Sequence, residues 1–333
     1  MGAINLQEAS KALISRMDCA IRGGREQFMD KFTEHFCAYC DQIYQMQQEG
    51  TKGAIAYLHF SVLRTNILLR RHEVRMDAYD ESWYMDTAEC SAYYPVEEIY
   101  SYLEEYMDLV EALQKEANGG ISLAEAQKRI FVESRHHLFY LAQLIRLAMQ
   151  RAILTEEYKR VKRAPVFVVC IGGFMDRFDI LYKEDQTKKD SARIKRYLKS
   201  KRQTLFSYEI YRGLDLSDGD FAGVEFQYSV FDESDLTGSR WRRGSLLFSS
   251  CRDTVFREAD MEQIRIFDTD FSGAVFDRVN LAGAKLKHVS FAGASLCGID
   301  FSKALLMEEI DFTGARIEDC ILPEGAKGWS ILS

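Results

Sequence analysis

The stretch VNLAGAKLKHVSFAGASLCGIDFSKALL, residues 279–306, decides the fold of the C-terminal third of this chain. Large apolar side chains recur in it at every fifth position, as at Leu281, Leu286 and Phe291, and the residue two positions before is mostly small, as at Ala284, Ala294 and Ala304. An α-helix repeats every 3.6 residues and a simple strand every two, so neither produces both columns. A fixed period of this kind indicates a solenoid of stacked, similar turns.

The same register extends far beyond that stretch. Steps of five residues pass through nineteen consecutive apolar positions, Leu216, Phe221, Phe226, Phe231, Leu236, Trp241, Leu246, Cys251, Phe256, Met261, Ile266, Phe271, Phe276, Leu281, Leu286, Phe291, Leu296, Phe301 and Leu306. We expect one inserted residue after Leu306, because the register resumes at Phe312, Ile317 and Leu322. The solenoid is therefore predicted to run from about Leu214 to Leu322.

Residues 279–306 resemble the pentapeptide-repeat family, whose motif is A(D/N)Lxx. The resemblance implies a right-handed quadrilateral β-helix with four repeats in each twenty-residue coil. The fifth-position side chain and the preceding small residue would both point inward. Residues twenty apart would then stack at the ordinary strand spacing of about 4.8 Å. One interior column would contain Phe226, Leu246, Ile266, Leu286 and Leu306.

Residues 1–153 are predicted to form an all-α helical bundle. Apolar side chains recur at alternating three- and four-residue steps in three segments, residues 25–47, 95–116 and 122–153. This spacing is typical of amphipathic helices. The glycine pairs at 23–24 and 119–120 are expected to end helices. Between Arg71 and Tyr94 the periodicity fails, and an ordered irregular connection is expected there.

The predicted fold class is thus multidomain α + β, an N-terminal all-α helical bundle followed by the repeat β-helix. The predicted parts are a helical domain at 1–153, a basic connector at 154–211 with a strand at Pro165–Ile171 and a helix at Lys188–Leu205, the β-helix at 212–322, and a C-terminal cap or tail at 323–333. Residues 212–333 contain 21 acidic and 13 basic side chains, and the basic connector therefore separates two acidic regions.

The composition excludes several classes of protein. A hydrophobic fraction of 47% argues against disorder. No run approaches the roughly 18 to 20 consecutive apolar residues of a membrane span, and the first ten residues do not resemble a signal peptide. Eight scattered cysteines in 333 residues are expected to be reduced thiols. We therefore expect a cytoplasmic protein without a membrane partner.

One outward side of the predicted β-helix is apolar and forms the candidate interaction face. Stacking at twenty residues gathers there Tyr228, Leu247, Phe248, Phe267, His288, Leu305 and Met307. Large apolar side chains on the outside of a solenoid indicate a contact surface. That surface would be covered by the helical domain, by a second copy of the chain or by another protein.

Candidate metal ligands are few. Cys37 and Cys40, with His35 beside them, have the i, i+3 spacing of ligands on one helix face. No second cysteine pair accompanies them, and Cys40 lies on the apolar stripe of its helix, so ordinary packing is the simpler interpretation. We predict no metal site and no cofactor.

Candidate catalytic and nucleic-acid-binding residues also have simpler interpretations. His136 and His137 could supply a base, but no nucleophile signature accompanies them. Gly172–Gly173 lacks the phosphate-loop motifs and is predicted to be a turn. A basic run comprises Lys188, Lys189, Arg193, Lys195, Arg196, Lys199, Lys201 and Arg202. Because its neighbours are acidic, a solvated or internally paired helix is favoured over a nucleic-acid site.

The sequence therefore predicts a non-enzymatic interaction scaffold that binds a protein partner or a second copy of itself. Some pentapeptide-repeat proteins mimic DNA and inhibit or protect a type II topoisomerase, and the acidic balance of residues 212–333 permits this alternative. Basic side chains interrupt the acidic surface at Arg240, Arg242, Arg243, Arg252, Arg257 and Arg265. A third alternative is an enzyme with its activity in the helical domain.

Overall fold

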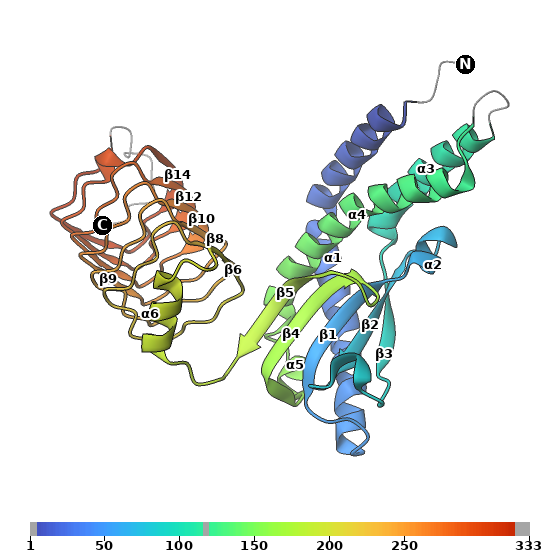
Figure 1. Ribbon diagram of the computed structural model, residues 1–333, viewed down its shortest axis with the longest axis horizontal. Helices are drawn as coiled ribbons and strands as arrows, with labels where there is room; N and C mark the ends of the chain where they lie inside the picture. Colours follow the sequence, from blue (N-terminus) through green and yellow to red (C-terminus); the bar gives the residue numbers. More distant parts are fainter. Residues whose placement is uncertain (1–4, 116–119, 324–333) are drawn as a thin grey trace. The chain divides into compact units, whose positions relative to one another are not determined.

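The computed structural model of the protein describes residues 5–115 and 120–323. The chain divides into two compact units, Met1–Gln186 and Thr187–Ser333, called here the N-terminal unit and the repeat unit. Figure 1 shows that the first combines helices with a sheet and that the second is a stack of coils. None of the helices in the described ranges combines the length and apolar character needed to cross a membrane.

The N-terminal unit contains a five-stranded mixed sheet beside its helices. The helices are α1 (Leu6–Gln48), α2 (Arg64–Leu68), the 3₁₀ helix η1 (Trp83–Met85), α3 (Glu97–Gln114), α4 (Leu123–Ala152) and α5 (Glu156–Arg160). The strands are β1 (Ile55–Val62), β2 (Glu73–Tyr79), β3 (Ser91–Pro95), β4 (Arg163–Gly173) and β5 (Phe178–Asp185). Their order is β3-β2-β1-β4-β5, in which only β1 and β4 are parallel neighbours.

The prediction of an all-α N-terminal domain was wrong. In β1 and β2 the apolar side chains alternate, and Leu58, Phe60 and Met76 are buried in the same core as the helices. The alternate positions are aromatic or polar but are also largely buried, so the sequence does not show a simple inside–outside pattern. The segment between Arg71 and Tyr94, predicted to be irregular, contains β2, η1 and β3.

Helix α1 passes through Gly23–Gly24, where a helix end was predicted. Each glycine costs about 1 kcal/mol relative to alanine inside a helix. Met17 before the pair and Phe28 and Phe32 after it are buried in one core, and this burial offsets the cost. The helices predicted at 95–116 and 122–153 are confirmed as α3 and α4.

The segment 154–211 belongs to both units. The strand predicted at Pro165–Ile171 is part of β4, which with β5 lies in the N-terminal sheet. The predicted basic helix is α6 (Ser191–Lys199) and belongs to the repeat unit. The predicted cap or tail at 323–333 lies outside the described residues except for Pro323.

The repeat unit is a β-solenoid in which every coil adds a strand parallel to the last. Its six-stranded sheet, in sequence order, contains β6 (Leu205–Ser207), β7 (Glu225–Gln227), β8 (Ser245–Leu247), β10 (Arg265–Asp270), β12 (Lys285–Ser290) and β14 (Leu306–Asp311). Its four-stranded sheet contains β9 (Val255–Arg257), β11 (Val275–Asp277), β13 (Ser295–Cys297) and β15 (Arg316–Glu318), and the 3₁₀ helix η2 is Phe301–Lys303. Outside these two sheets, isolated parallel bridges such as Ile210↔Val230 and Asp220↔Arg240 pair successive coils. The twenty-residue coil is thereby confirmed.

Side chains twenty residues apart stack inside the solenoid. The ring centroids of Phe256 and Phe276 lie 4.8 Å apart, and those of Phe271 and Phe291 lie 5.4 Å apart with an interplanar angle of 12°. Every fifth-position side chain from Leu216 to Phe301 leaves at most 2% of its surface exposed. The interior columns are therefore removed from water, as in an ordinary protein core.

The inserted residue lies one step earlier than the sequence predicts. Leu286 pairs with Met307, not with Leu306, so Met307 occupies the interior column. The carbonyl of Ala284 accepts hydrogen bonds from the amides of Leu305 at 2.8 Å and Leu306 at 3.3 Å. Leu305 and Leu306 thus oppose a single residue of the preceding coil, and this arrangement is a β-bulge. The extra side chain, that of Leu305, is 69% exposed.

Deleting Leu305 is expected to change the free energy of unfolding of the repeat unit by less than about 1 kcal/mol, because no interior side chain is lost. Urea unfolding followed by circular dichroism measures this. As a control, deleting Lys287, which lies in a coil without a bulge, should be far more destabilising because it misaligns the following coils. Equal losses in the two deletions would contradict the assignment of the bulge.

Substituting Phe271→Ala is expected to cost about 3–5 kcal/mol, because it leaves a cavity between stacked rings. The control is Phe267→Ala, which removes an outward, half-buried ring only four residues away and should cost about 1 kcal/mol or less. Urea unfolding compares the two variants. A larger loss at Phe267 would show that the interior columns are misassigned.

Candidate functional site

Three aromatic rings stack along one edge of the six-stranded sheet. The ring of Tyr228 lies between those of Tyr208 and Phe248, with both centroid distances at 5.0 Å and interplanar angles of 12° and 13°. All three residues have a left-handed backbone conformation, with φ between 51° and 59°, at the position where the coil leaves the strand. Near-parallel rings at this separation attract one another beyond the area that they bury.

Two further apolar side chains adjoin the stack. Leu247 and Phe267 are paired neighbours on β8 and β10, and the amide of Phe248 donates to the carbonyl of Phe267 at 2.9 Å. Phe248 is 50% exposed and Tyr228, Leu247 and Phe267 are half-buried, whereas Tyr208 is buried, with 8% of its surface exposed. We call these residues together the aromatic patch: Tyr208, Tyr228, Leu247, Phe248 and Phe267.

The other predicted residues of the face lie elsewhere. His288 follows in the same column but is held between Asp268, with Nδ1 3.3 Å from Oδ1, and Glu309, with Nε2 2.6 Å from Oε2. Leu305 lies in the bulge before β14, and Met307 packs against the core. The structure therefore brings together Tyr228, Leu247, Phe248 and Phe267 of the predicted set. It adds Tyr208, which lies twenty residues before Tyr228. Extending the twenty-residue spacing back by one coil would have identified it.

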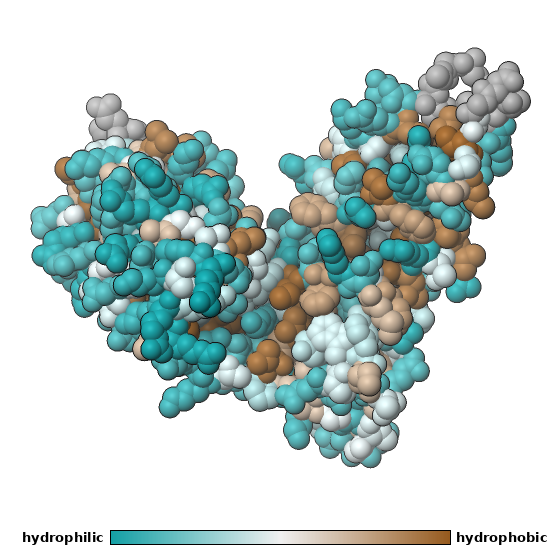
Figure 2. Space-filling model, in the orientation of Figure 1, coloured by the Kyte–Doolittle hydropathy of each residue, from teal (hydrophilic) through white to brown (hydrophobic). Residues whose placement is uncertain are grey.

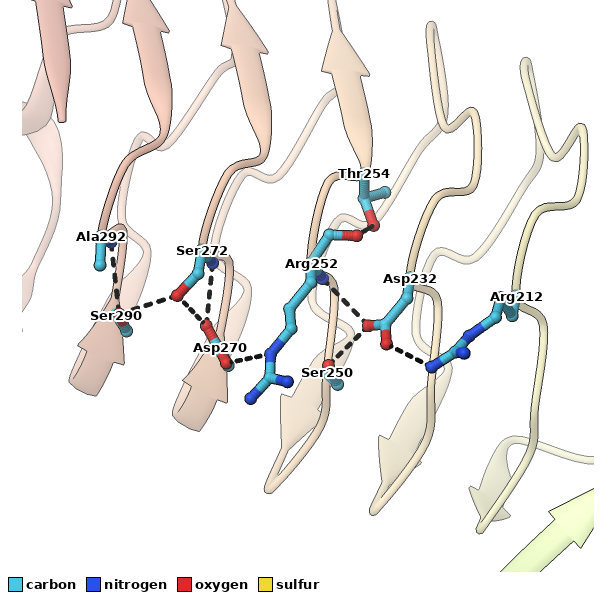
Figure 3. A network of polar contacts seen from close by, with 9 residues as sticks. All are labelled: Arg212, Asp232, Ser250, Arg252, Thr254, Asp270, Ser272, Ser290 and Ala292. Atoms are coloured by element: carbon cyan, nitrogen blue, oxygen red, sulfur yellow. Dashed lines mark hydrogen bonds and ion pairs between the residues drawn. The ribbon is translucent and has the colours of Figure 1, made fainter. Parts of the chain in front are cut away.

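Acidic side chains of the solenoid are paired with arginines of neighbouring coils. In Figure 3, Asp232 accepts a bond from Arg212 at 2.9 Å and one from the backbone amide of Arg252 at 3.0 Å. The guanidinium of Arg252 in turn binds Asp270 at 2.5 Å. On other sides, Arg278 binds Glu258 at 2.7 Å and Arg265 binds Glu225 at 2.8 Å. Several of the acidic side chains are thus compensated locally, and Figure 2 shows a mainly hydrophilic visible surface on these coils.

The basic helix α6 closes the first coil of the solenoid. Lys195 donates to the backbone carbonyl of Ser217 at 3.1 Å, and Lys201 donates to that of Asp220 at 2.8 Å. Leu198 is buried in the solenoid core beside Phe206. Repeat arrays need such a cap because the terminal coil has no neighbour. These contacts favour the internally paired interpretation of the basic run.

Cys37 and Cys40 on α1 are packing residues in the described structure. Cys40 is 1% exposed, and burial raises the pKa of its thiol well above the usual range. Burial also raises the pKa of Cys37. Nδ1 of His35 lies 2.9 Å from the carbonyl of Lys31 in the same helix. Within residues 5–115 and 120–323, no three His, Cys, Asp or Glu side chains are grouped so as to hold a metal ion.

The histidines on α4 have separate environments. His137 is fully buried, its Nδ1 lies 3.2 Å from the carbonyl of Glu133, and burial lowers its pKa. His136 is exposed, and its Nδ1 lies 3.6 Å from a carboxylate oxygen of Glu133. The ring of His137 packs near Tyr100, with 6.3 Å between centroids, so this histidine contributes to the core.

The N-terminal sheet contains a cluster of titratable side chains that the sequence pattern does not reveal. The strand registers place His59 beside Asp77 on β2 and beside Cys170 on β4. Burial lowers the pKa of His59 to about 4 and raises that of Cys170 to about 12. Near neutral pH the imidazole is therefore uncharged and the thiol is protonated, and a protonated thiol is a poor nucleophile. Only a correct pairing of three distant strands could have revealed this cluster.

Acidification is expected to destabilise the N-terminal unit through His59. Its pKa is about 4 in the folded protein and 6.5 ordinarily, so the unfolded state binds an additional proton between these values. The free energy of unfolding should therefore fall as the pH drops from 6.5 to 4, by roughly 3 kcal/mol in total. Urea unfolding of His59→Gln should show a shallower fall over this window than the wild type.

The slope that remains in His59→Gln is expected from His137, whose pKa is also lowered. Should His59→Gln fail to fold, titration of the His59 ring by NMR in the wild type gives the same information. A wild-type ring that titrates near pH 6.5, or an unchanged slope in the variant, would contradict the assignment.

Comparison with known proteins gives one family match. A family model described as pentapeptide repeats matches residues 265–302, with eight copies. No curated protein sequence matches the chain.

Three solved structures are similar to part of the chain. Rfr23, a pentapeptide repeat protein from the cyanobacterium Cyanothece 51142, is 13% identical, with 36% of this chain and 84% of that chain covered and a TM-score of 0.23. QnrB1, a plasmid-mediated fluoroquinolone resistance protein, is 15% identical, with 35% and 69% covered and a TM-score of 0.22. HetL, a pentapeptide repeat protein involved in heterocyst differentiation regulation from Nostoc sp. strain PCC 7120, is 15% identical, with 41% and 95% covered and a TM-score of 0.12.

Proposed function

Because the C-terminal region of the chain is a pentapeptide-repeat β-solenoid, we propose that the protein is a non-enzymatic interaction module that binds a protein partner through the aromatic patch. The observation that carries this proposal is the exposed ring of Phe248, which stacks on the half-buried Tyr228 and, through it, on the buried Tyr208. The fifth-position side chains already fill the solenoid core, so the core does not need the exposed ring of Phe248. Aromatic side chains, by contrast, supply much of the energy of protein interfaces.

The solenoid holds the patch in a fixed arrangement. The amide of Tyr228 donates to the carbonyl of Leu247, and that of Phe248 donates to the carbonyl of Phe267, both at 2.9 Å. Each ring is therefore anchored to the next coil through the backbone. A surface that is ordered before binding loses less conformational entropy when the partner arrives.

Charged groups around the patch define the chemistry of the partner. Beyond Phe248 the column continues with Asp268 and His288, which pair with each other, and Lys287 pairs with Glu308 at 3.0 Å on the adjacent column. The complementary surface would thus be apolar or aromatic at its centre and polar with mixed charge at its rim. This agrees with a protein partner better than with a polyanion.

Two other classes of function have less support. A DNA mimic needs a continuous array of uncompensated carboxylates, whereas Asp232, Asp270 and Glu258 are paired with arginines. Inhibition of supercoiling by purified gyrase that persists in Phe248→Ser would favour the mimic. An enzyme in the N-terminal unit would need a reactive group, and burial keeps the thiols of Cys40 and Cys170 protonated.

The cysteines support a location in the cytoplasm. All eight are free, although Cys19 is exposed and Cys37, Cys297 and Cys320 are partly so. Accessible free thiols persist in a reducing compartment. We therefore place the proposed interaction in the cytoplasm.

Substituting Phe248→Ser is expected to weaken binding of the partner at least tenfold, since truncation of a central aromatic side chain costs about 2 kcal/mol or more. Affinity capture from the source cells compares wild type, Phe248→Ser and the control Val255→Ser. Val255 is an outward, half-buried residue on the other sheet. The proposal predicts a protein that is captured by the wild type and by Val255→Ser but lost with Phe248→Ser.

Light scattering on the purified chain identifies the case in which the captured protein is a second copy. A concentration-dependent dimer that Phe248→Ser abolishes would assign the patch to self-association. Capture that is independent of Phe248, together with a monomer at all concentrations, would reject the aromatic patch as the binding surface.

A further inference from the structure

A pocket in the N-terminal unit lies at the carboxyl ends of β1 and β4. These parallel neighbours end at Val62 and Gly173 on the same edge of the sheet. The sheet order in Figure 1 shows that β2 lies on one side of this pair and β5 on the other, so the connections that follow β1 and β4 diverge. Diverging connections open a crevice outside the strand ends, which is where open sheets with parallel strands bind ligands.

A cavity of about 470 Å³ occupies this edge. Its apolar wall includes Ile67 of α2, Phe131 and Leu138 of α4, and Ile171 of β4. This volume is within the range of small-molecule sites, about 300–1,000 Å³. The pocket is thus large enough for a small organic molecule and offers it an apolar surface.

The Gly172–Gly173 pair, predicted from sequence to be a turn, shapes this pocket. A Cβ on Gly172 would lie 2.2 Å from the carbonyl oxygen of Arg177, so only glycine lets the β4–β5 hairpin close at this point. The tight hairpin places Asp176 and Arg177 on the rim of the cavity. The glycines therefore contribute by bringing a charged turn close to the sheet edge.

Three arginines border the cavity, Arg64 of α2, Arg135 of α4 and Arg177 of the hairpin. Arg64 is bound to Asp176, with Nη2 3.2 Å from Oδ2, and lies 5.7 Å from the ring centroid of Phe131. Across the described ranges 5–115 and 120–323, no carboxylate lies within ion-pair distance of Arg135 or Arg177.

The charges of the rim do not cancel. Asp176 and Asp179 are the acidic side chains of the lining, against the three arginines. Lys128 on the adjoining surface of α4 adds a further cation. The pocket therefore combines an apolar wall with an excess of positive charge.

We propose that this pocket binds a small organic anion. Its carboxylate, sulfonate or phosphate group pairs with Arg135 and Arg177, and its aromatic or aliphatic part contacts Phe131 and Leu138. Guanidinium groups suit such oxyanions because they donate two parallel hydrogen bonds. A neutral apolar molecule would leave both arginines unpaired, and inorganic phosphate would leave the apolar wall uncovered. Both halves of the ligand are required, and this site is independent of the aromatic patch.

Fluorescence titration of the full chain with two dyes of the same ring system tests the proposal. Anilinonaphthalene sulfonate carries the anion, and N-phenyl-naphthylamine lacks it. Arg135→Gln and Arg177→Gln are each expected to raise the Kd of the sulfonate dye about tenfold, as expected for a lost charge-assisted contact, and that of the neutral dye by less than about twofold. Both arginines are exposed, so the variants should fold normally.

The matched control is Arg129→Gln, on the same helix but outside the cavity, where the arginine pairs with Glu125 at 2.9 Å. It should change neither Kd by more than about twofold. Leu138→Ala should weaken both dyes, because both use the apolar wall. Sulfonate binding that is absent, that is unaffected by Arg135→Gln and Arg177→Gln, or that is lost only in Phe248→Ser would overturn the proposal.

Discussion

Parallel backbone pairing between residues twenty apart is the constraint on which the repeat unit depends. It brings equivalent positions of successive coils into contact, so that each column of side chains becomes a ladder. Inside, the ladders must be apolar because a coil has no other core, and Phe271 and Phe291 show the resulting stack. Outside, this requirement is absent. The exposed ring of Phe248, stacked on Tyr228, is therefore the basis of the proposed interaction, whereas ion pairs such as Arg278–Glu258 suit a solvated surface.

The repeat unit was largely predictable, because its rule is local and periodic. Chemistry alone could not locate the bulge, since Leu306 and Met307 are both apolar and either could fill the interior column, and only the pairing of Leu286 with Met307 distinguishes them. That single step moved Met307 from the predicted face into the core and left Leu305 apart from the patch. Side chains can thus be assigned to their columns within an uninterrupted register but not beyond an insertion.

The N-terminal unit was predicted less well, because its sheet depends on pairing between distant segments. Strands β1 and β4 are separated by about a hundred residues, and nothing local indicates that they are parallel neighbours. Buried polar side chains at His59 and Asp77 further obscure the strand pattern. The arginine-bordered pocket arises from the same long-range pairing, so the sequence showed only its Gly172–Gly173 turn.

The most direct test of the central claim is disulfide formation between engineered cysteines, read by mass spectrometry of the linked peptides. Arg243, Glu258 and Arg278 share one backbone conformation, with φ of 56°, 53° and 52°. Glu258→Cys with Arg278→Cys, twenty residues apart, should link readily, because stacked positions lie within disulfide reach. Arg243→Cys with Glu258→Cys, fifteen apart, should not link, because these positions lie on different sides of the coil. Equal linkage of the two pairs, or linkage of the fifteen-residue pair alone, would contradict the twenty-residue stack.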